Sequence, residues 1–372
     1  MTSSAASLIV QDLIRDPIGN YPFSTVACFD PMTGDLPRRR LNHLLTTEFL
    51  YSLTLPHKTE SGTAEVGAVL IGASTGQGHL RTSDELEEWF QVAAQPKPSH
   101  ATAKRERELI LTALLRPEDG IANERLLDVL AELRYSVVFV RPGTNLGSNP
   151  SDRAIVENMR PIVAGAAKRG LAIGLYSISD VSGCPMSPDV AADVVAGPGG
   201  DSIVAIKVTE ADYENSTLRF LDDPRLAHLK IVQGWDPHLA RALQDGPRHD
   251  LQRRQRCGFT SGAMSFALTP YLEIARLAAI QDWAGIKVIQ EVVTKVFASM
   301  QDDPGKFADL QRAKVIMGLG QPINRDVTSE QEERVFDALE ELPASAAKNM
   351  LIQSMMLIPE AGWTERLASY LG

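Results

Sequence analysis

The strongest constraint on the fold of this chain is a regular alternation of short apolar runs with longer amphipathic segments. Short apolar runs bounded by polar or turn-forming residues are typical of buried strands. Eight such runs cover residues 24–29, 66–72, 109–115, 136–141, 171–177, 202–207, 229–234 and 257–262. Segments with the periodicity of amphipathic helices follow them, at residues 38–53, 82–94, 122–134, 151–169, 187–196, 209–221, 236–245 and 270–281.

A strand followed by a helix, repeated eight times, predicts parallel strands joined by crossover helices. Eight such units fit a closed (β/α)8 TIM barrel better than an open doubly wound sheet. No G-x-G-x-x-G motif opens a helix after the first strand, which also disfavours a dinucleotide-binding fold. We therefore expect an α/β protein built on a (β/α)8 barrel.

The C-terminal part of the chain has a different pattern. Beyond residue 283 the periodicity is entirely helical, and no linker-like segment separates it from what precedes. We expect a barrel over residues 20–283 and a C-terminal helical extension over residues 284–372 that packs on the barrel. Two polar segments, 55–65 and 93–106, interrupt the alternation and are expected to be flexible insertions.

Charge and composition exclude several classes of function. The formal net charge is −10 with no basic patch, which argues against nucleic-acid binding. No segment approaches the about 20 apolar residues of a transmembrane helix, and the N-terminal residues lack the pattern of a secretory signal. The three cysteines lie far apart, without metal-site spacing, and suit a reducing compartment. We therefore expect a soluble, cytoplasmic protein that needs no metal and binds no membrane.

The sixth apolar run ends in a lysine, Lys207. Strand alternation is expected to place Ile203, Ala205 and Lys207 on one side, and Val204 and Ile206 on the other. Lysine is almost never fully buried unless it is paired. In (β/α)8 barrels, however, catalytic groups lie at the C-terminal ends of the strands, which is where this lysine stands.

Two interpretations of Lys207 follow from its position. An amine held in an apolar interior has a lowered pKa, because burial disfavours its charged form. The neutral amine is a nucleophile towards carbonyl groups and can form a Schiff base. Alternatively, the lysine reaches solvent or pairs with Glu210 or Asp212, and the strand by itself favours this simpler structural role.

Motifs on five strand ends occur in a recognisable order. They are "GASTGQ" (72–77), "YSIS" (176–179), "IVAIK" (203–207), "VQGWD" (232–236) and "CGFTSGAMS" (257–265). Their order and spacing resemble the dihydrodipicolinate synthase / N-acetylneuraminate lyase family of class I aldolases, over about residues 20–342. The resemblance implies a (β/α)8 barrel with C-terminal helices, and Lys207 matches the lysine that forms the Schiff base with a 2-oxo acid.

The resemblance also implies roles for other residues. Ser74 and Thr75 match two hydroxyl residues that bind the 2-oxo acid carboxylate and join a proton relay, although the same letters also suit an ordinary turn. Thr260, on the matching eighth strand, is expected to bind substrate. Tyr176 closes the strand next to that of Lys207, so its phenol is either catalytic or packed with its hydroxyl satisfied.

The strand-four loop departs from the family pattern. Thr144 stands where the family has its proton-relay tyrosine, and Leu146 where dihydrodipicolinate synthases have a substrate-binding arginine. A threonine hydroxyl is far less acidic than a phenol, although a water bridged by Thr144 would partly restore the relay. We keep Thr144 among the catalytic candidates. Arg141, at the end of the same strand, either binds a carboxylate or forms a structural ion pair.

These residues predict a class I aldolase or lyase that acts on a 2-oxo acid or related carbonyl compound through Lys207. It is not expected to be a true dihydrodipicolinate synthase, because of Thr144 and Leu146. No cofactor is expected, because the iminium is itself the electron sink. By analogy with the family, a homodimer or homotetramer is expected. The alternative is a family member without aldolase activity, which acts as a binding or regulatory protein or catalyses another reaction.

Overall fold

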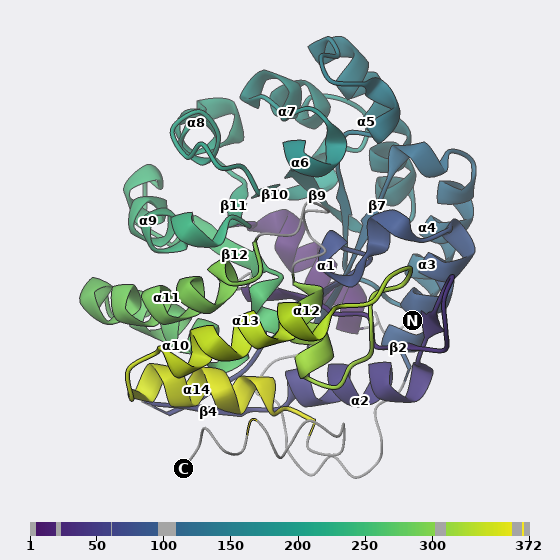
Figure 1. Cartoon of the computed structure of the whole chain (residues 1–372). Coiled ribbons are helices and arrows are strands. Elements are labelled where there is room, and N and C mark those ends of the chain that lie inside the picture. The colour runs from purple at the N-terminus through teal and green to yellow at the C-terminus, as the bar shows by residue number, and fades with distance from the viewer. Residues whose placement is uncertain are drawn as a thin grey trace.

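A computed structural model describes residues 5–19, 24–60, 62–95, 109–301, 310–358 and 367 of the chain. Eight parallel strands form a closed barrel in the order β1-β12-β11-β10-β9-β8-β7-β6 (Figure 1). They are β1 (Ser24–Ala27), β6 (Ala68–Ile71), β7 (Ile110–Leu115), β8 (Val137–Val140), β9 (Ala172–Ser177), β10 (Ile203–Val208), β11 (Lys230–Gln233) and β12 (Cys257–Ser261). The expected (β/α)8 barrel is confirmed, with each predicted strand present.

Helices surround the barrel in the expected order. They are α2 (His43–Thr54), α3 (Ser83–Ala93), α4 (Ala122–Glu132), α5 (Asp152–Lys168), α7 (Pro188–Val195), α8 (Thr217–Asp222), α9 (Leu239–Asp245) and α10 (Leu268–Ala279). The helix expected over 209–221 is wrong in its first half, because only 217–222 is helical. Asp212 accepts bonds from the backbone and side chain of Asn215, and such local bonds compete with a helix.

A helix that the sequence analysis did not identify covers the N-terminal end of the barrel. Helix α1 (Ala5–Arg15) lies at the centre of the barrel in projection (Figure 1). Its residues Ile9, Val10 and Leu13 are buried in one cluster with the first residues of four strands, which are Ala68, Ile110, Val137 and Ala172. The interior of the barrel is therefore shielded from water at the end opposite the C-terminal ends of the strands.

The strand that carries Lys207 does not alternate regularly. The register with β9 shifts between Ile203 and Ala205. Ile203 consequently packs in the outer cluster between strands and helices, whereas Val204 and Ala205 both pack in the inner cluster. The prediction for Ile203 and Val204 is therefore wrong. It holds beyond the irregularity, where Ala205 and Lys207 both face the interior.

The C-terminal helices are α11 (Trp283–Ala298), α12 (Gln311–Ile316), α13 (Ser329–Glu340) and α14 (Ala346–Met355). They lie along one side of the barrel, where α14 contacts α10 and α11 (Figure 1). The Ser354 hydroxyl accepts a bond of 2.9 Å from the Thr269 amide at the start of α10. The predicted boundary between barrel and extension, at residue 283, coincides with the first residue of α11. That these are two separate units stays a prediction.

The expected insertions have different outcomes. Segment 55–65 is not a flexible insertion, because it contains the antiparallel strands β4 (His57–Thr59) and β5 (Gly62–Ala64), which contact α10. Most of segment 93–106 lies outside the described residues. A second small hairpin, β2 (Met32–Thr33) with β3 (Arg40–Leu41), follows β1. None of the described helices has the length and apolar character needed to cross a membrane.

Candidate active site

A cavity of about 240 Å³ opens at the C-terminal ends of the strands. It brings together five of the six residues selected from the sequence, which are Ser74, Thr75, Tyr176, Lys207 and Thr260. The sixth, Thr144, is not among the lining residues; it is exposed, in a short 3₁₀ turn after β8. The catalytic and binding roles of all six stay predictions.

The Lys207 amine is buried without an ionic partner. Its side chain is only 3% exposed, and no ion pair or hydrogen bond joins it to another described residue. The suggested partners are engaged elsewhere, because Glu210 accepts bonds from Ser177 and Ser179, and Asp212 from Asn215. Burial lowers the pKa of Lys207 to about 7, against a smaller opposing effect of Asp236. A large fraction of this amine is therefore neutral at neutral pH.

Tyr176 lies against this amine. The two residues are register partners on β9 and β10, and the Lys207 Nζ lies 4.0 Å from the centroid of the Tyr176 ring. The Tyr176 hydroxyl accepts a bond of 3.2 Å from Thr209 Oγ1, and burial raises its pKa. Its phenol is thus positioned by Thr209, which the sequence analysis did not select although it follows the lysine by two residues.

Gly234 leaves room for the side chains of Lys207 and Thr209. A Cβ added at Gly234, just after β11, would lie 2.1 Å from Thr209 Oγ1 and 3.1 Å from Lys207 Cε. A contact of 2.1 Å does not occur between real atoms, so a side chain here would displace Thr209, and it would also lie tightly against the end of the Lys207 side chain. The motif "VQGWD" therefore contributes to the site first by having no side chain at its third position.

Ser74 and Thr75 lie in a tight 3₁₀ turn, Ser74–Gly76, after β6. The amides of Gly76 and Gly78 both bond to the Ala73 carbonyl, which closes the turn. A Cβ at Gly76 would lie 2.0 Å from the Trp89 ring, so the chain approaches that side chain as only glycine can. Neither hydroxyl bonds to another described residue, which leaves both free to bind an oxygen of a ligand. Thr260 Oγ1 likewise has no partner, although its residue is 1% exposed.

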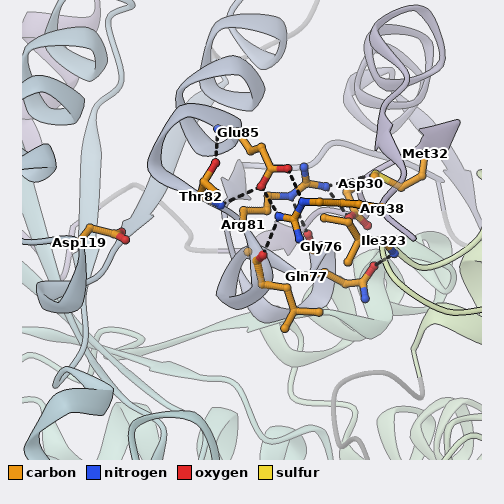
Figure 2. Close-up of polar contacts among 12 residues, drawn as sticks. Asp30, Met32, Arg38, Gly76, Gln77, Arg81, Thr82, Glu85, Asp119 and Ile323 are labelled. Carbon is orange, nitrogen blue, oxygen red and sulfur yellow. Dashed lines mark hydrogen bonds and ion pairs between the residues drawn. The ribbon is translucent and has the colours of Figure 1, made fainter. Parts of the chain in front are cut away.

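A fully buried group of charges lies behind this turn. Asp30, after β1, accepts a bond of 2.6 Å from Arg81 and one of 2.9 Å from Lys314 on α12. Arg81 also donates to the Gly76 carbonyl at 3.4 Å, as Figure 2 shows. Helix α3 begins directly after Arg81 with a capping box formed by Thr82 and Glu85. Arg81 therefore links this turn to Asp30 and, through Asp30, to Lys314 on α12.

The C-terminal extension also bonds to the turn directly. Gln311 Nε2 donates to the Thr75 carbonyl at 2.7 Å. Gln77, which stands where the family has a glutamate, has a left-handed backbone with φ of 51°, and its Oε1 accepts a bond of 2.7 Å from the Ile323 amide (Figure 2). The extension is therefore part of the structure that positions Ser74 and Thr75.

No protein-family model matches this chain, and no curated protein is similar to it in sequence. Solved structures do match. A dihydrodipicolinate synthase from Bacillus anthracis is 16% identical with a TM-score of 0.65, over 87% of this chain and 99% of that one. A sialic acid aldolase from Ruminococcus gnavus is 14% identical with a TM-score of 0.64, over 90% of this chain and 98% of that one. A prophage protein of the dihydrodipicolinic acid synthase family from E. coli K12, in complex with pyruvate, is 13% identical with a TM-score of 0.66, over 87% and 99%.

This chain has the fold of those proteins. The match spans nearly the full length of each of them, so the barrel and the helices that follow it are shared.

The end of the fourth strand distinguishes between the two roles considered for Arg141. The Arg141 guanidinium is 1% exposed, and it pairs with Glu118, which also lowers the pKa of that carboxyl. It also donates to the Pro142 carbonyl at 2.8 Å. The structure therefore favours the structural ion pair over a carboxylate-binding role. Leu146 is partly buried and packs against the outer core. Its side chain carries no charge and so cannot bind a second carboxylate.

Several cavity residues were not selected from the sequence. They are Asp180, Thr209, Trp235, Asp236, Pro237, Phe297, Gln301 and Leu310. Trp235 and Asp236 lie in a motif that the sequence analysis quoted, so the signal for them was present. Phe297, Gln301 and Leu310 come from the C-terminal extension, and nothing in their local sequence indicates that they reach the barrel mouth.

Proposed function

We propose that this protein is a divergent member of the dihydrodipicolinate synthase / N-acetylneuraminate lyase family, and a class I aldolase or lyase. In this proposal Lys207 forms a Schiff base with a 2-oxo acid or a related carbonyl compound. Ser74 and Thr75 bind the carboxylate of that substrate, Thr260 contacts it, and Tyr176 assists near the amine. Thr144 would take part in proton transfer only through a bridging water molecule. No cofactor takes part.

The buried, unpaired amine of Lys207 is the observation that carries the proposal. A structural lysine is expected to have an ionic partner, whereas this one faces a cavity and has its pKa lowered to about 7 by burial. The hydroxyls of Ser74 and Thr75 line the same cavity, and neither bonds to another residue in the described part of the chain. The shared fold with aldolase structures, and with a protein in complex with pyruvate, adds support.

Borohydride trapping tests the proposal. Reduction in the presence of pyruvate should attach the substrate carbons to Lys207, as peptide mass spectrometry would show. Only the neutral amine attacks, so the trapping rate should rise about tenfold per pH unit below pH 7 and level off above it. An adduct on another lysine, or no adduct with a panel of small 2-oxo acids and aldehydes, would contradict the assignment.

We also propose that the protein is not a dihydrodipicolinate synthase. Leu146 carries no charge, and Lys207 is the one basic side chain among the described residues that line the cavity. A second carboxylate would therefore find no cation there. Condensation of pyruvate with aspartate semialdehyde should be undetectable under conditions in which pyruvate trapping is complete. Rapid condensation in a coupled reductase assay would contradict this part of the proposal.

The second candidate is a family member that binds a carbonyl compound without aldolase turnover. The exposed position of Thr144, away from the cavity, favours it. Such a protein would trap pyruvate on Lys207 but cleave no 4-hydroxy-2-oxo acid. In either case we propose a homodimer or homotetramer, which light scattering of the purified protein would measure.

A further inference from the structure

The proposed reaction needs a proton-transfer group that Thr144 does not supply. Cleavage of a 4-hydroxy-2-oxo acid requires a base for the C4 hydroxyl and an acid for the resulting enamine. Apart from Lys207, the titratable side chains among the described lining residues are Tyr176, Asp180 and Asp236. Asp180 is exposed at the rim. Tyr176 has its hydroxyl bonded to Thr209, and burial raises its pKa, so the phenolate that could act as a base is scarcely populated near neutral pH.

Asp236 is anchored on one oxygen and open on the other. It begins the 3₁₀ turn Asp236–His238 just after β11. Its Oδ1 accepts a bond of 2.6 Å from Ser261 Oγ and another from the hydroxyl of Tyr271, whereas its Oδ2 bonds to no other described residue. Its backbone carbonyl accepts a bond of 3.2 Å from Gln290. The carboxyl of this cavity-lining residue is thus held through one oxygen, while the other oxygen has no partner among the described residues.

Asp236 and Lys207 line the same cavity without pairing directly. The charge of each affects the other, but no ion pair joins them. Burial raises the pKa of Asp236, which brings its affinity for a proton closer to what acid–base work near neutral pH needs. Tyr271 is buried with its pKa also raised, so it remains a hydrogen-bond donor to the carboxylate.

We propose that Asp236, positioned by Ser261 and Tyr271, is the general acid and base of this site. This proposal rests on the function proposed above. With the substrate bound to Lys207 as an iminium, the Asp236 carboxylate removes the proton of the C4 hydroxyl. The electron pair of that O–H bond forms the carbonyl of the leaving aldehyde, and the C3–C4 bond breaks.

The released electron pair forms the C2=C3 bond and neutralises the iminium nitrogen, which gives an enamine. Asp236, now a carboxylic acid, returns its proton to C3 and regenerates an iminium of the shortened 2-oxo acid. Water then hydrolyses this iminium and frees Lys207. The proton taken from the hydroxyl ends on C3, so the cleavage needs no oxidant, reductant or further reactant.

Exchange of the C3 protons of pyruvate in D₂O isolates this step. Exchange requires both the Schiff base and a base that moves protons at C3, whereas borohydride trapping requires the Schiff base alone. Asp236→Asn keeps the shape but not the basicity of the side chain. It should trap pyruvate like the parent, while exchange followed by NMR should fall about 10²- to 10⁴-fold.

Three further variants separate catalysis from packing. In Asp236→Ala, added acetate should restore part of the exchange, which a merely structural role would not allow, and this variant also serves if Asp236→Asn folds poorly. Tyr271→Phe keeps the carboxylate but loses one bond to it, so exchange should fall about tenfold. Asp180→Asn, which removes a carboxylate at the rim, should exchange like the parent.

The outcomes are distinguishable. Exchange at the parental rate in Asp236→Asn overturns the role of Asp236 and leaves the proposed Schiff-base function standing. An equal loss in Asp180→Asn overturns it as well, because it would indicate a general effect of negative charge at the cavity. Failure of the parent to trap pyruvate or any other 2-oxo acid overturns the proposed function, and this inference with it.

Discussion

Replacement of Lys207 by methionine should abolish adduct formation and at the same time make the protein more stable at pH 7. Methionine has a similar length and no amine, so the site loses its nucleophile. The buried amine forms no hydrogen bond and no ion pair with the residues that the structure describes, so its removal leaves none of them unsatisfied. Activity and stability should therefore change in opposite directions, as expected where a residue is retained for function.

The sign of the stability change follows from the pKa of Lys207. Burial lowers it from 10.5 to about 7, so between these values the unfolded chain holds a proton that the folded chain does not. Stability of the parent therefore rises with pH across this window, and the destabilising effect is fully present below pH 7. At one pKa unit per about 1.36 kcal/mol, Lys207→Met should gain on the order of 2–4 kcal/mol at pH 7.

Urea unfolding at pH 7 and pH 10 would measure this difference. The difference in free energy of unfolding between Lys207→Met and the parent should be smaller at pH 10. At that pH burial of the amine costs the parent little, because most of the amine is neutral in the folded chain and part of it is neutral in the unfolded chain. Lys230→Met is the matched control. Lys230 is also buried, on the neighbouring strand β11, but its Nζ donates a bond of 2.8 Å to the Gln255 carbonyl. Lys230→Met should still form the full adduct on Lys207. A Lys207→Met protein that is less stable than the parent at pH 7 would contradict the prediction.

Asp30→Asn should cause a large loss of stability. Arg81 and Lys314 both pair with Asp30, and all three side chains are at most 1% exposed. Removing the carboxylate leaves two buried cations close together without compensation, which costs about 3–5 kcal/mol. Because Arg81 also bonds to the turn that carries Ser74 and Thr75, trapping of pyruvate should weaken as well.

The control for this prediction is Lys314→Met, which keeps the Arg81–Asp30 pair and fills the volume of the lysine with an apolar side chain. It should be close to neutral, because it leaves one cation and one anion paired. Thermal unfolding of both variants provides the comparison. An Asp30→Asn protein as stable as Lys314→Met would show that the group does not depend on its carboxylate.

Local sequence patterns were sufficient for the barrel and for much of the site. Apolar runs and helical periodicity report how each segment meets its neighbours, so they indicate the eight units without any knowledge of distant contacts. Lys207 and Tyr176 were selected because each stands at the end of a strand, whereas Ser74, Thr75 and Thr260 were selected through the resemblance of their motifs to those of a known family. In a barrel all such ends lie at one mouth, so topology alone brings them together.

Other features depend on contacts that no local pattern records. The irregular register at Ile203 depends on pairing with β9, and α1 is stabilised only by the barrel interior that it covers. Gln311 bonds to the turn after β6, and Lys314 bonds to Asp30, each from more than two hundred residues away in the sequence.

The same distinction explains the chemistry of the site. The sequence by itself determined that a lysine ends the sixth strand and that no tyrosine follows the fourth. Only the tertiary structure decided that this lysine has no ionic partner among the described residues and that Asp236 lines the same cavity with one oxygen unbonded. The reason is physical. The pKa and reactivity of a side chain depend on water, charges and hydrogen-bond partners around it, and these come from parts of the chain that folding alone brings together.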